Sequence, residues 1–211
     1  MPPRPTLEFE RVAWAGAQLL AGVDEVGRGP LAGPVVAAAV VFPCHCVFLD
    51  GVRDSKTVPA PRREALAAAI RAAALCVGLG AASVREIDRL NIRVATALAM
   101  RRALLRALPR GLAAPACRIV VDGLAMSEIG FPHQAVVDGD ALCYSVAAAG
   151  LVAKTVRDAL MQRLARRYPG YGWDTNMGYG TEEHLAGLER RGPTRHHRLT
   201  FAPVAQLSLS G

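Results

Sequence analysis

Acidic side chains at the ends of three predicted β-strands are the residues of this chain best suited to chemistry. If these strands share one edge of a sheet, their carboxylates lie within a few ångströms of one another and repel unless cations bind between them. Hard oxygen ligands without histidine or cysteine favour Mg²⁺ or Mn²⁺. Two such ions roughly 4 Å apart can activate a water molecule and stabilise the leaving oxygen in phosphodiester hydrolysis. The candidate catalytic and metal-binding residues are Asp24, Glu25, Asp122 and Asp140.

These acids also have a purely structural interpretation. Asp before Gly is a common turn signal, and for Asp122 taken alone a turn is the better interpretation. Adjacent residues of a regular strand point to opposite faces, so Asp24 and Glu25 serve one site only if the strand distorts or Glu25 approaches from another direction. Beside this pair, Gly27-Arg28-Gly29 offers backbone N–H groups and a cation, which suit an anionic polymer.

Hydrophobic periodicity predicts the elements that must position these acids. Apolar runs predict strands over 19–23, 35–42, 78–83, 118–121 and 134–137. Ala-rich or amphipathic segments predict helices over 62–76, 83–108 and 141–168 and after Thr181, with a loop over 169–180. Ser83 and Glu86 have the spacing of a capping box. This order predicts an α/β domain with a mixed sheet and a helical C-terminal part.

The composition suits a polyanionic partner without requiring one. The chain has 211 residues, enough for one large domain or a domain with a small appendage. Its formal charge is +7 and its sequence pI is about 9.6. The arginine clusters can equally be solvated helix faces. They are Arg101, Arg102, Arg106 and Arg110; Arg163, Arg166 and Arg167; and Arg190, Arg191, Arg195 and Arg198.

Cysteine usage and hydropathy bear on the compartment. The five cysteines show no repeated C-x-x-C spacing, which predicts a reduced, intracellular protein. Cys44-His45-Cys46 lacks a partner pair at a usual spacing, so a structural zinc site is not expected. No run has the pattern of a signal peptide or the length to span a bilayer. We therefore expect a soluble, cytoplasmic protein.

The stretch Asp24-Glu25-Val26-Gly27-Arg28-Gly29 resembles the signature of ribonuclease HII, the type 2 ribonucleases H, in their bacterial form. The resemblance continues in the same order through the chain and covers nearly residues 16 to 204. The other matching blocks are Asp54-Ser55-Lys56, Glu86-Ile87-Asp88 with Asn91-Ile92, Asp122-Gly123, Gly139-Asp140, Ala153-Lys154 with Arg157-Asp158, Gly178-Tyr179, and His197-Arg198 with Phe201.

This resemblance implies a ribonuclease H-like α/β fold, with a central mixed five-stranded sheet flanked by helices and a C-terminal helical extension. The implied segments are a flexible N-terminal segment (1–15), the catalytic domain (16–168), the substrate-binding extension (169–205) and a tail (206–211). The implied reaction hydrolyses the RNA strand of RNA–DNA hybrids and nicks 5′ of single ribonucleotides in duplex DNA, leaving 3′-hydroxyl and 5′-phosphate ends. Two Mg²⁺ or Mn²⁺ ions and a monomeric protein are expected.

The resemblance also implies roles for substrate-binding residues. Gly27-Arg28-Gly29 resembles the loop whose backbone recognises the ribose 2′-hydroxyl, the group that distinguishes RNA from DNA. Tyr179 resembles the tyrosine that stacks on the sugar at an RNA–DNA junction. Ser55, Lys56 and Lys154 resemble phosphate contacts. Without the resemblance, Tyr179 is an ordinary loop aromatic and Lys154 a solvated helix residue.

Some positions depart from the expected pattern. Asp138 stands where many relatives carry lysine, Gly150 replaces a usual serine, and Met177 occupies a position that is often basic. None of these changes removes an expected metal ligand, so we expect an active enzyme. Gln206-Leu207-Ser208-Leu209 resembles the start of a peptide that binds the bacterial sliding clamp, but it lacks the aromatic anchor, and a disordered tail explains it better.

Two other functions remain open from the sequence. A noncatalytic nucleic-acid-binding module would share the basic composition, although uncompensated carboxylates repel phosphate. A nuclease of the same fold that resolves DNA junctions would share the acids. The Gly27-Arg28-Gly29 loop and Tyr179 favour recognition of ribose over both alternatives.

Overall fold

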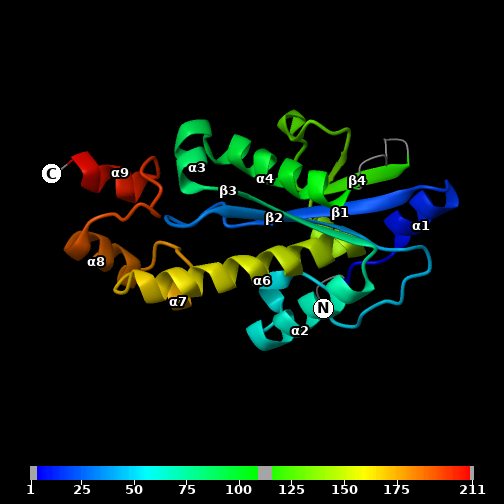
Figure 1. The fold of residues 1–211 in the computed structure, drawn as a ribbon, viewed down its shortest axis with the longest axis horizontal. Helices are drawn as coiled ribbons and strands as arrows, with labels where there is room; N and C mark the ends of the chain where they lie inside the picture. Colours follow the sequence, from blue (N-terminus) through cyan, green and yellow to red (C-terminus); the bar gives the residue numbers. More distant parts are fainter. Residues whose placement is uncertain (1–3, 109–115, 210–211) are drawn as a thin grey trace.

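A five-stranded mixed sheet forms the centre of the molecule (Figure 1). The computed structural model describes residues 4–108 and 116–209, with the backbone alone for 207–209. The strand order is β3-β2-β1-β4-β5; β2 runs antiparallel to both its neighbours, while β1, β4 and β5 are parallel. The strands are β1 (Leu19–Val26), β2 (Val35–Val41), β3 (Cys76–Ala82), β4 (Cys117–Asp122) and β5 (Gln134–Val136). The predicted fold class is confirmed.

Helices cover both faces of this sheet. Helix α4 packs on one face, and α6 with α2 packs on the other, while α7, α8 and α9 lie beyond the end of the sheet (Figure 1). The helices are α1 (Glu8–Ala15), α2 (Ala60–Ala73), α3 (Val84–Leu90), α4 (Ile92–Ala107), α5 (Gly139–Leu142), α6 (Tyr144–Arg167), α7 (Trp173–Asn176), α8 (Glu182–Arg191) and α9 (Ala202–Leu209). Two 3₁₀ turns, η1 (Ser55–Thr57) and η2 (Ser127–Ile129), complete the described elements.

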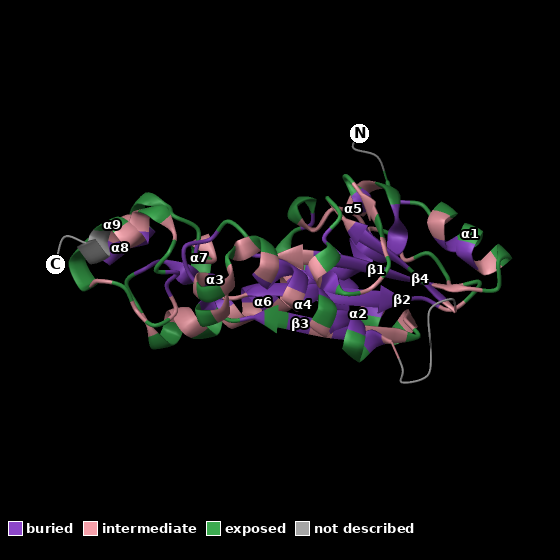
Figure 2. Cartoon of the chain, turned by 90° about the horizontal axis from the view of Figure 1, so that it is seen from above, coloured by how far each residue is buried: buried purple, intermediate pink, exposed green. Residues whose placement is uncertain are grey.

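Short side chains allow the helices to lie directly on the strands. Every residue of β2 is buried (Figure 2). Its side chains alternate between the α4 side and the α6 side of the sheet. A Cβ atom at Gly80 would lie 2.0 Å from the Ala99 carbonyl oxygen of α4, and one at Gly22 would lie 2.2 Å from the Ser145 carbonyl carbon of α6. The Ala- and Gly-rich composition thus brings α6 against β1, the strand that carries two of the acids.

The N-terminal segment differs from the expected flexible stretch, because Glu8–Ala15 forms helix α1. Glu10 of this helix is 1% exposed. Its Oε1 accepts hydrogen bonds from the Ser145 backbone N–H at 2.7 Å and from the Ser145 hydroxyl at 2.6 Å. These bonds satisfy donors in the first turn of α6, which have no partner within that helix. Contacts between residues that are 135 positions apart in the sequence therefore hold α1 against the start of α6.

The predicted helix over 83–108 is two helices. Asn91 has a φ of +68° and separates α3 from α4, and its Oδ1 accepts a hydrogen bond from the Val94 N–H at 3.1 Å. The predicted capping box of Ser83 and Glu86 is confirmed at the start of α3. The helix was expected to stop near Pro109 and Gly111; α4 ends at Ala107 with Leu108 as its C-cap, and residues 109–115 lie outside the described part of the chain.

Smaller differences occur in the C-terminal half. The helix predicted over 141–168 divides at Cys143 into α5 and α6, and the predicted loop over 169–180 contains the short helix α7. Helix α9 continues to Leu209, so the tail expected from Gln206 begins inside a helix. The remaining side chains of the clamp-like peptide lie outside the described part of the chain. Within that part, no helix has the length and apolar character needed to cross a membrane.

Candidate active site

The parallel pairing of β1 with β4 brings two acids to one edge of the sheet. The pairing ends at Val23 and Val121, and the next residue on each strand is an acid, Asp24 or Asp122. Strand β1 stays paired with β2 as far as Val26. The strand is therefore regular at the two adjacent acids, and Asp24 lies on the α6 side while Glu25 projects from the other face. Glu25 reaches the same cavity from another direction, which is the second of the two predicted possibilities.

A cavity of about 490 Å³ contains all four predicted acids and much of the predicted substrate-binding set. Of that set, Ser55, Lys56, Lys154 and Tyr179 line the cavity. The loop Gly27-Arg28-Gly29 is not part of the lining and lies next to it. The full lining is Asp24, Glu25, Val26, Asp54, Ser55, Lys56, Arg63, Asp122, Asp140, Lys154, Asp158, Thr175, Met177 and Tyr179.

Burial and mutual repulsion make the acids of this cavity hold protons more tightly. Asp24 is 8% exposed, and its pKa is raised well above the usual value by burial and by the charges of Glu25, Asp122 and Asp140. Burial also raises the pKa of Glu25, although the Arg28 guanidinium partly offsets this effect. The pKa of Asp140 is raised by burial and by Asp122. Positive charge placed among these groups would relieve the repulsion.

The donor set fits a divalent cation, but it is not a preformed cage. Carboxylate oxygens are the ligands preferred by Mg²⁺ and Mn²⁺. Among residues 4–108 and 116–209, no three His, Cys, Asp or Glu side chains are arranged to hold a metal ion as they stand. Asp24 Oδ1 accepts a hydrogen bond from the Glu25 N–H at 2.7 Å, and its other oxygen is directed at Gly150. One oxygen of Asp24 is thus engaged by the backbone, and the other faces α6.

The two later acids are held by the segment that follows β5. Asp122 Oδ1 accepts a hydrogen bond from the Gly139 N–H at 2.7 Å. Asp138 adopts a left-handed conformation with a φ of +54°, and α5 begins at the next residue. Asp140 consequently lies in the first turn of α5 and not at a strand end. Asp138, which departs from the expected lysine, adds to the charges that raise the pKa of Asp140.

A buried ion-pair network holds the cationic side of the cavity. The Lys154 Nζ lies 2.7 Å from Asp158 Oδ1, and Arg63 Nη2 lies 2.9 Å from Asp158 Oδ2. Arg63 Nη1 also donates to the Ser55 carbonyl at 3.0 Å, and Asp54 Oδ1 accepts from the Lys56 N–H at 2.9 Å. The network holds the ammonium group of Lys154, and the bond to Asp54 holds the backbone at Lys56. Asp54 and Asp158 had no predicted role, although both line the cavity. Arg63, Thr175 and Met177 were not predicted to line it, and no motif marks Arg63.

The glycine-flanked loop lies against the exposed tyrosine. Gly27 has a φ of +93°, and a Cβ atom there would lie 2.1 Å from Arg157 Nε, so this position favours glycine. A Cβ atom at Gly29 would lie 3.5 Å from the Tyr179 ring. Arg28 is exposed, and its Nη1 lies 3.5 Å from Glu25 Oε1. The loop and Tyr179, which is 46% exposed, thus form a continuous surface beside the acids.

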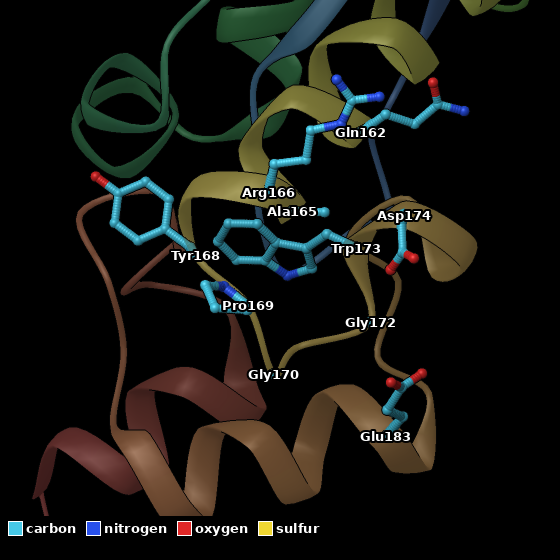
Figure 3. A pocket seen from close by; sticks show the side chains of 10 residues that line it. All are labelled: Gln162, Ala165, Arg166, Tyr168, Pro169, Gly170, Gly172, Trp173, Asp174 and Glu183. Atoms are coloured by element: carbon cyan, nitrogen blue, oxygen red, sulfur yellow. The ribbon is translucent and has the colours of Figure 1, made fainter.

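A second and larger cavity, of about 590 Å³, lies where the end of α6 meets α7 and the start of α8 (Figure 3). Arg166 and Gln162 project from α6, while Asp174 and Glu183 come from the two later helices. This cavity contains none of the predicted site residues. Size alone does not make a catalytic site, and the smaller cavity is the one in which several acids perturb one another.

Comparisons with known proteins agree with the fold and the motifs. The family model described as ribonuclease HII matches residues 21–204. A ribonuclease HII from Synechococcus is 51% identical over 207 residues, which cover 97% of this chain and 91% of that protein. One from Rhodospirillum rubrum is 53% identical over 206 residues, covering 96% of this chain and 91% of that protein.

Solved structures show the same architecture. The ribonuclease H2 of Pyrococcus horikoshii has a TM-score of 0.74 at 23% identity, covering 92% of this chain and 98% of that chain. Bst-RNase HIII in complex with Mn²⁺ has a TM-score of 0.68 at 20% identity, covering 92% of this chain and 70% of that chain. These two likenesses support the fold alone, whereas the family model and the curated relatives extend over most of the sequence. The chain therefore belongs to the ribonuclease HII family and is a ribonuclease H, a hydrolase.

Proposed function

We propose that the chain hydrolyses the RNA strand of RNA–DNA hybrids and nicks duplex DNA on the 5′ side of a single embedded ribonucleotide. One observation carries the proposal: a single cavity holds Asp24, Glu25, Asp122 and Asp140, with Lys56 and Lys154 also in its lining. Acids alone repel a phosphodiester, whereas acids with bound cations and nearby lysines attract it. The adjoining loop and Tyr179 then supply the contacts that select ribose.

In the proposed reaction, water attacks the phosphorus atom on the 5′ side of the ribonucleotide. The bond from phosphorus to the upstream 3′-oxygen breaks, which leaves a 3′-hydroxyl and a 5′-phosphate. The four acids would hold Mg²⁺ or Mn²⁺, which when bound supplies water activation and neutralises developing charge. Bst-RNase HIII has been solved with Mn²⁺. The raised pKa values of Asp24, Glu25 and Asp140 support this assignment, since repulsion among them falls when cations bind.

The chain's own groups would orient the substrate. Lys56 and Lys154 line the cavity, and Lys154 would exchange part of its pairing with Asp158 for a phosphate oxygen. Backbone groups of the Gly27–Gly29 loop would hydrogen-bond the 2′-hydroxyl, since glycine allows close approach of the substrate. The Tyr179 ring lies against Gly29 and would stack on the neighbouring sugar.

A nicking assay tests the proposal. A duplex with one ribonucleotide and a continuous RNA–DNA hybrid are each incubated with the protein and with Mg²⁺ or Mn²⁺, and the product ends are mapped. We expect cleavage 5′ of the ribonucleotide, near-complete loss of cleavage in Asp24→Asn, and a larger loss at the single ribonucleotide than on the hybrid in Tyr179→Ala. Near-normal turnover of Asp24→Asn would contradict the role of the acids.

The same assay separates the noncatalytic alternative. A binding module would retain both duplexes without producing a nick at any concentration of Mg²⁺ or Mn²⁺. A DNA-only control duplex distinguishes ribose selection from general nuclease activity, because the proposed contacts require a 2′-hydroxyl. Equal cleavage of the control would remove the role proposed for the loop and Tyr179.

A further inference from the structure

Two fully buried histidines lie behind the surface formed by the loop and Tyr179. His184, in α8, is 0% exposed, and His197, in the segment between α8 and α9, is 1% exposed. His184 Nδ1 lies 2.9 Å from the Tyr179 carbonyl oxygen. Its Nε2 lies 2.9 Å from Trp173 Nε1 and 3.0 Å from His197 Nε2. Neither histidine lines the catalytic cavity.

The hydrogen-bond partners determine where the protons of this pair lie. A carbonyl oxygen only accepts, so His184 Nδ1 carries a proton and donates it to Tyr179. The indole N–H of Trp173 only donates, so His184 Nε2 is the acceptor. His197 Nδ1 accepts from the Thr194 N–H at 2.8 Å, which leaves the proton of the neutral ring on Nε2, facing His184. When both rings are neutral, every N–H of this group faces an acceptor, and His184 Nε2 shares its one lone pair between the Trp173 and His197 donors.

The same pair is joined to the glycine-flanked loop at its other end. The backbone of His197 bridges to Ala32, and the next side chain, Arg198, is fully buried. Its Nη1 donates to the Arg28 carbonyl at 2.7 Å, and its Nε donates to the Gly33 carbonyl at 3.0 Å. The buried side chains of His184, His197 and Arg198 thus connect Tyr179 to the glycine-flanked loop.

We propose that His184 and His197 are positioning residues that set the place of Tyr179 relative to the Gly27–Gly29 loop, and thereby the preference for a single embedded ribonucleotide over a continuous hybrid. The inference rests on the proposed function of that loop and Tyr179. Tyr179 is 46% exposed, so the contacts of its backbone contribute much of what holds its position. Its carbonyl accepts from His184 and from the Thr181 N–H at 2.9 Å. The Tyr179 N–H also donates to the Asn176 carbonyl at 2.9 Å. Losing one of the two donors to the Tyr179 carbonyl lets the peptide plane that follows the residue rotate and shifts the ring, and small displacements near a reacting group reduce rates.

Two substitutions at one position test this role. In His184→Asn the side-chain amide can take the place of Nδ1 and keep the bond to Tyr179, whereas in His184→Gln it takes the place of Nε2 and keeps the contacts to Trp173 and His197. We expect His184→Gln to lower kcat/KM at the single ribonucleotide about tenfold more than on the hybrid, the equivalent of one lost hydrogen bond. We expect His184→Asn to keep the ratio of the two activities within about twofold.

The controls separate this inference from the proposed function. His196→Gln changes the neighbouring histidine, which lies outside the pair, and should leave the ratio unchanged. If the parent protein cleaves neither duplex, the proposed function fails. If the parent cleaves both and His184→Gln keeps the parent ratio, the positioning role fails. Urea unfolding of each variant measures how much of any loss is general destabilisation, which would lower both activities alike.

If the variants do not fold, spectroscopy of the unmodified protein tests the hydrogen bond from His184 to Tyr179. Long-range ¹H–¹⁵N correlation spectra of histidine side chains distinguish a proton on Nδ1 from one on Nε2. The proposal requires the Nδ1-protonated form at His184 and the Nε2-protonated form at His197 at neutral pH. The opposite form at His184 would leave the Tyr179 carbonyl without its donor and would overturn the proposal.

Discussion

Acidification should lower the free energy of unfolding through His197, whose pKa in the folded protein sets the size of the effect. Burial and the neighbouring His184 lower the pKa of His197 from 6.5 to about 4; His196 adds to this effect, and the hydrogen bond from the Thr194 N–H opposes it. The unfolded chain therefore takes up this proton at a higher pH than the folded protein does. Stability is at its full value above about pH 6.5 and falls as the pH decreases towards 4.

The expected loss follows from the difference between the two pKa values. Each pKa unit corresponds to about 1.4 kcal/mol, so a shift from 6.5 to about 4 gives about 3.4 kcal/mol in total, of which about 2.5 kcal/mol is lost by pH 4.5. The pKa of His184 is also lowered by burial, so its contribution has the same sign. Protonating either ring would set an N–H group against the N–H group that now donates to it.

Urea unfolding followed by tryptophan fluorescence measures this loss, with His197→Asn as the matched variant. Asn keeps an acceptor for the Thr194 N–H and removes the titrating ring. Carboxylates titrate in the same range, but they contribute almost equally to both proteins and cancel in the difference. Between pH 7.5 and 4.5, the parent should lose about 2 to 3 kcal/mol more unfolding free energy than His197→Asn. Equal losses in the two proteins would refute the reasoning.

Three further substitutions have defined outcomes. Asp24→Asn should raise the urea midpoint at pH 8 without metal, because the raised pKa of Asp24 means that its ionised form destabilises the fold; a lower midpoint would contradict this. Gly27→Ala should lower the unfolding free energy by about 1–3 kcal/mol, because a Cβ atom would collide with Arg157, and unchanged stability would exclude that clash. Arg63→Met should cost less than the about 3–5 kcal/mol of a buried charge left wholly unpaired, because Asp158 keeps Lys154 as a partner at 2.7 Å; a larger loss in the same measurement would contradict this.

The acids and the sheet could be predicted because both leave local signals. Asp24 and Asp122 directly follow apolar runs, and runs of that length become strands that share an edge. The capping box at Ser83 is a similarly local pattern. Asp140 lines the cavity with the other acids, but it was wrongly expected at a strand end, because Asp138 turns the chain and helix α5 begins at the next residue, Gly139.

The supporting contacts could not be predicted, because they join residues far apart in the sequence. Glu10 looks like a surface acid until its bonds to Ser145 are known. Arg63 lies in an ordinary Ala-rich helix, and its partner Asp158 stands 95 residues later. Arg198 belongs to a cluster of arginines that composition assigns equally to solvent, yet it is fully buried. The roles of such residues can be identified only from the folded structure, in which their distant partners lie beside them.

The departure at Gly150 bears directly on the orientation of the Asp24 carboxylate. A Cβ atom at this position would lie 2.3 Å from Asp24 Oδ2, closer than two non-bonded atoms approach. The Asp24 carboxylate therefore occupies space that any other residue at 150 would fill. In that orientation it also accepts the Glu25 N–H, which partly offsets its burial. Gly150 thus permits an orientation of Asp24 directed towards α6 that a side chain at this position would exclude, so Gly150→Ala should shift the Asp24 carboxylate.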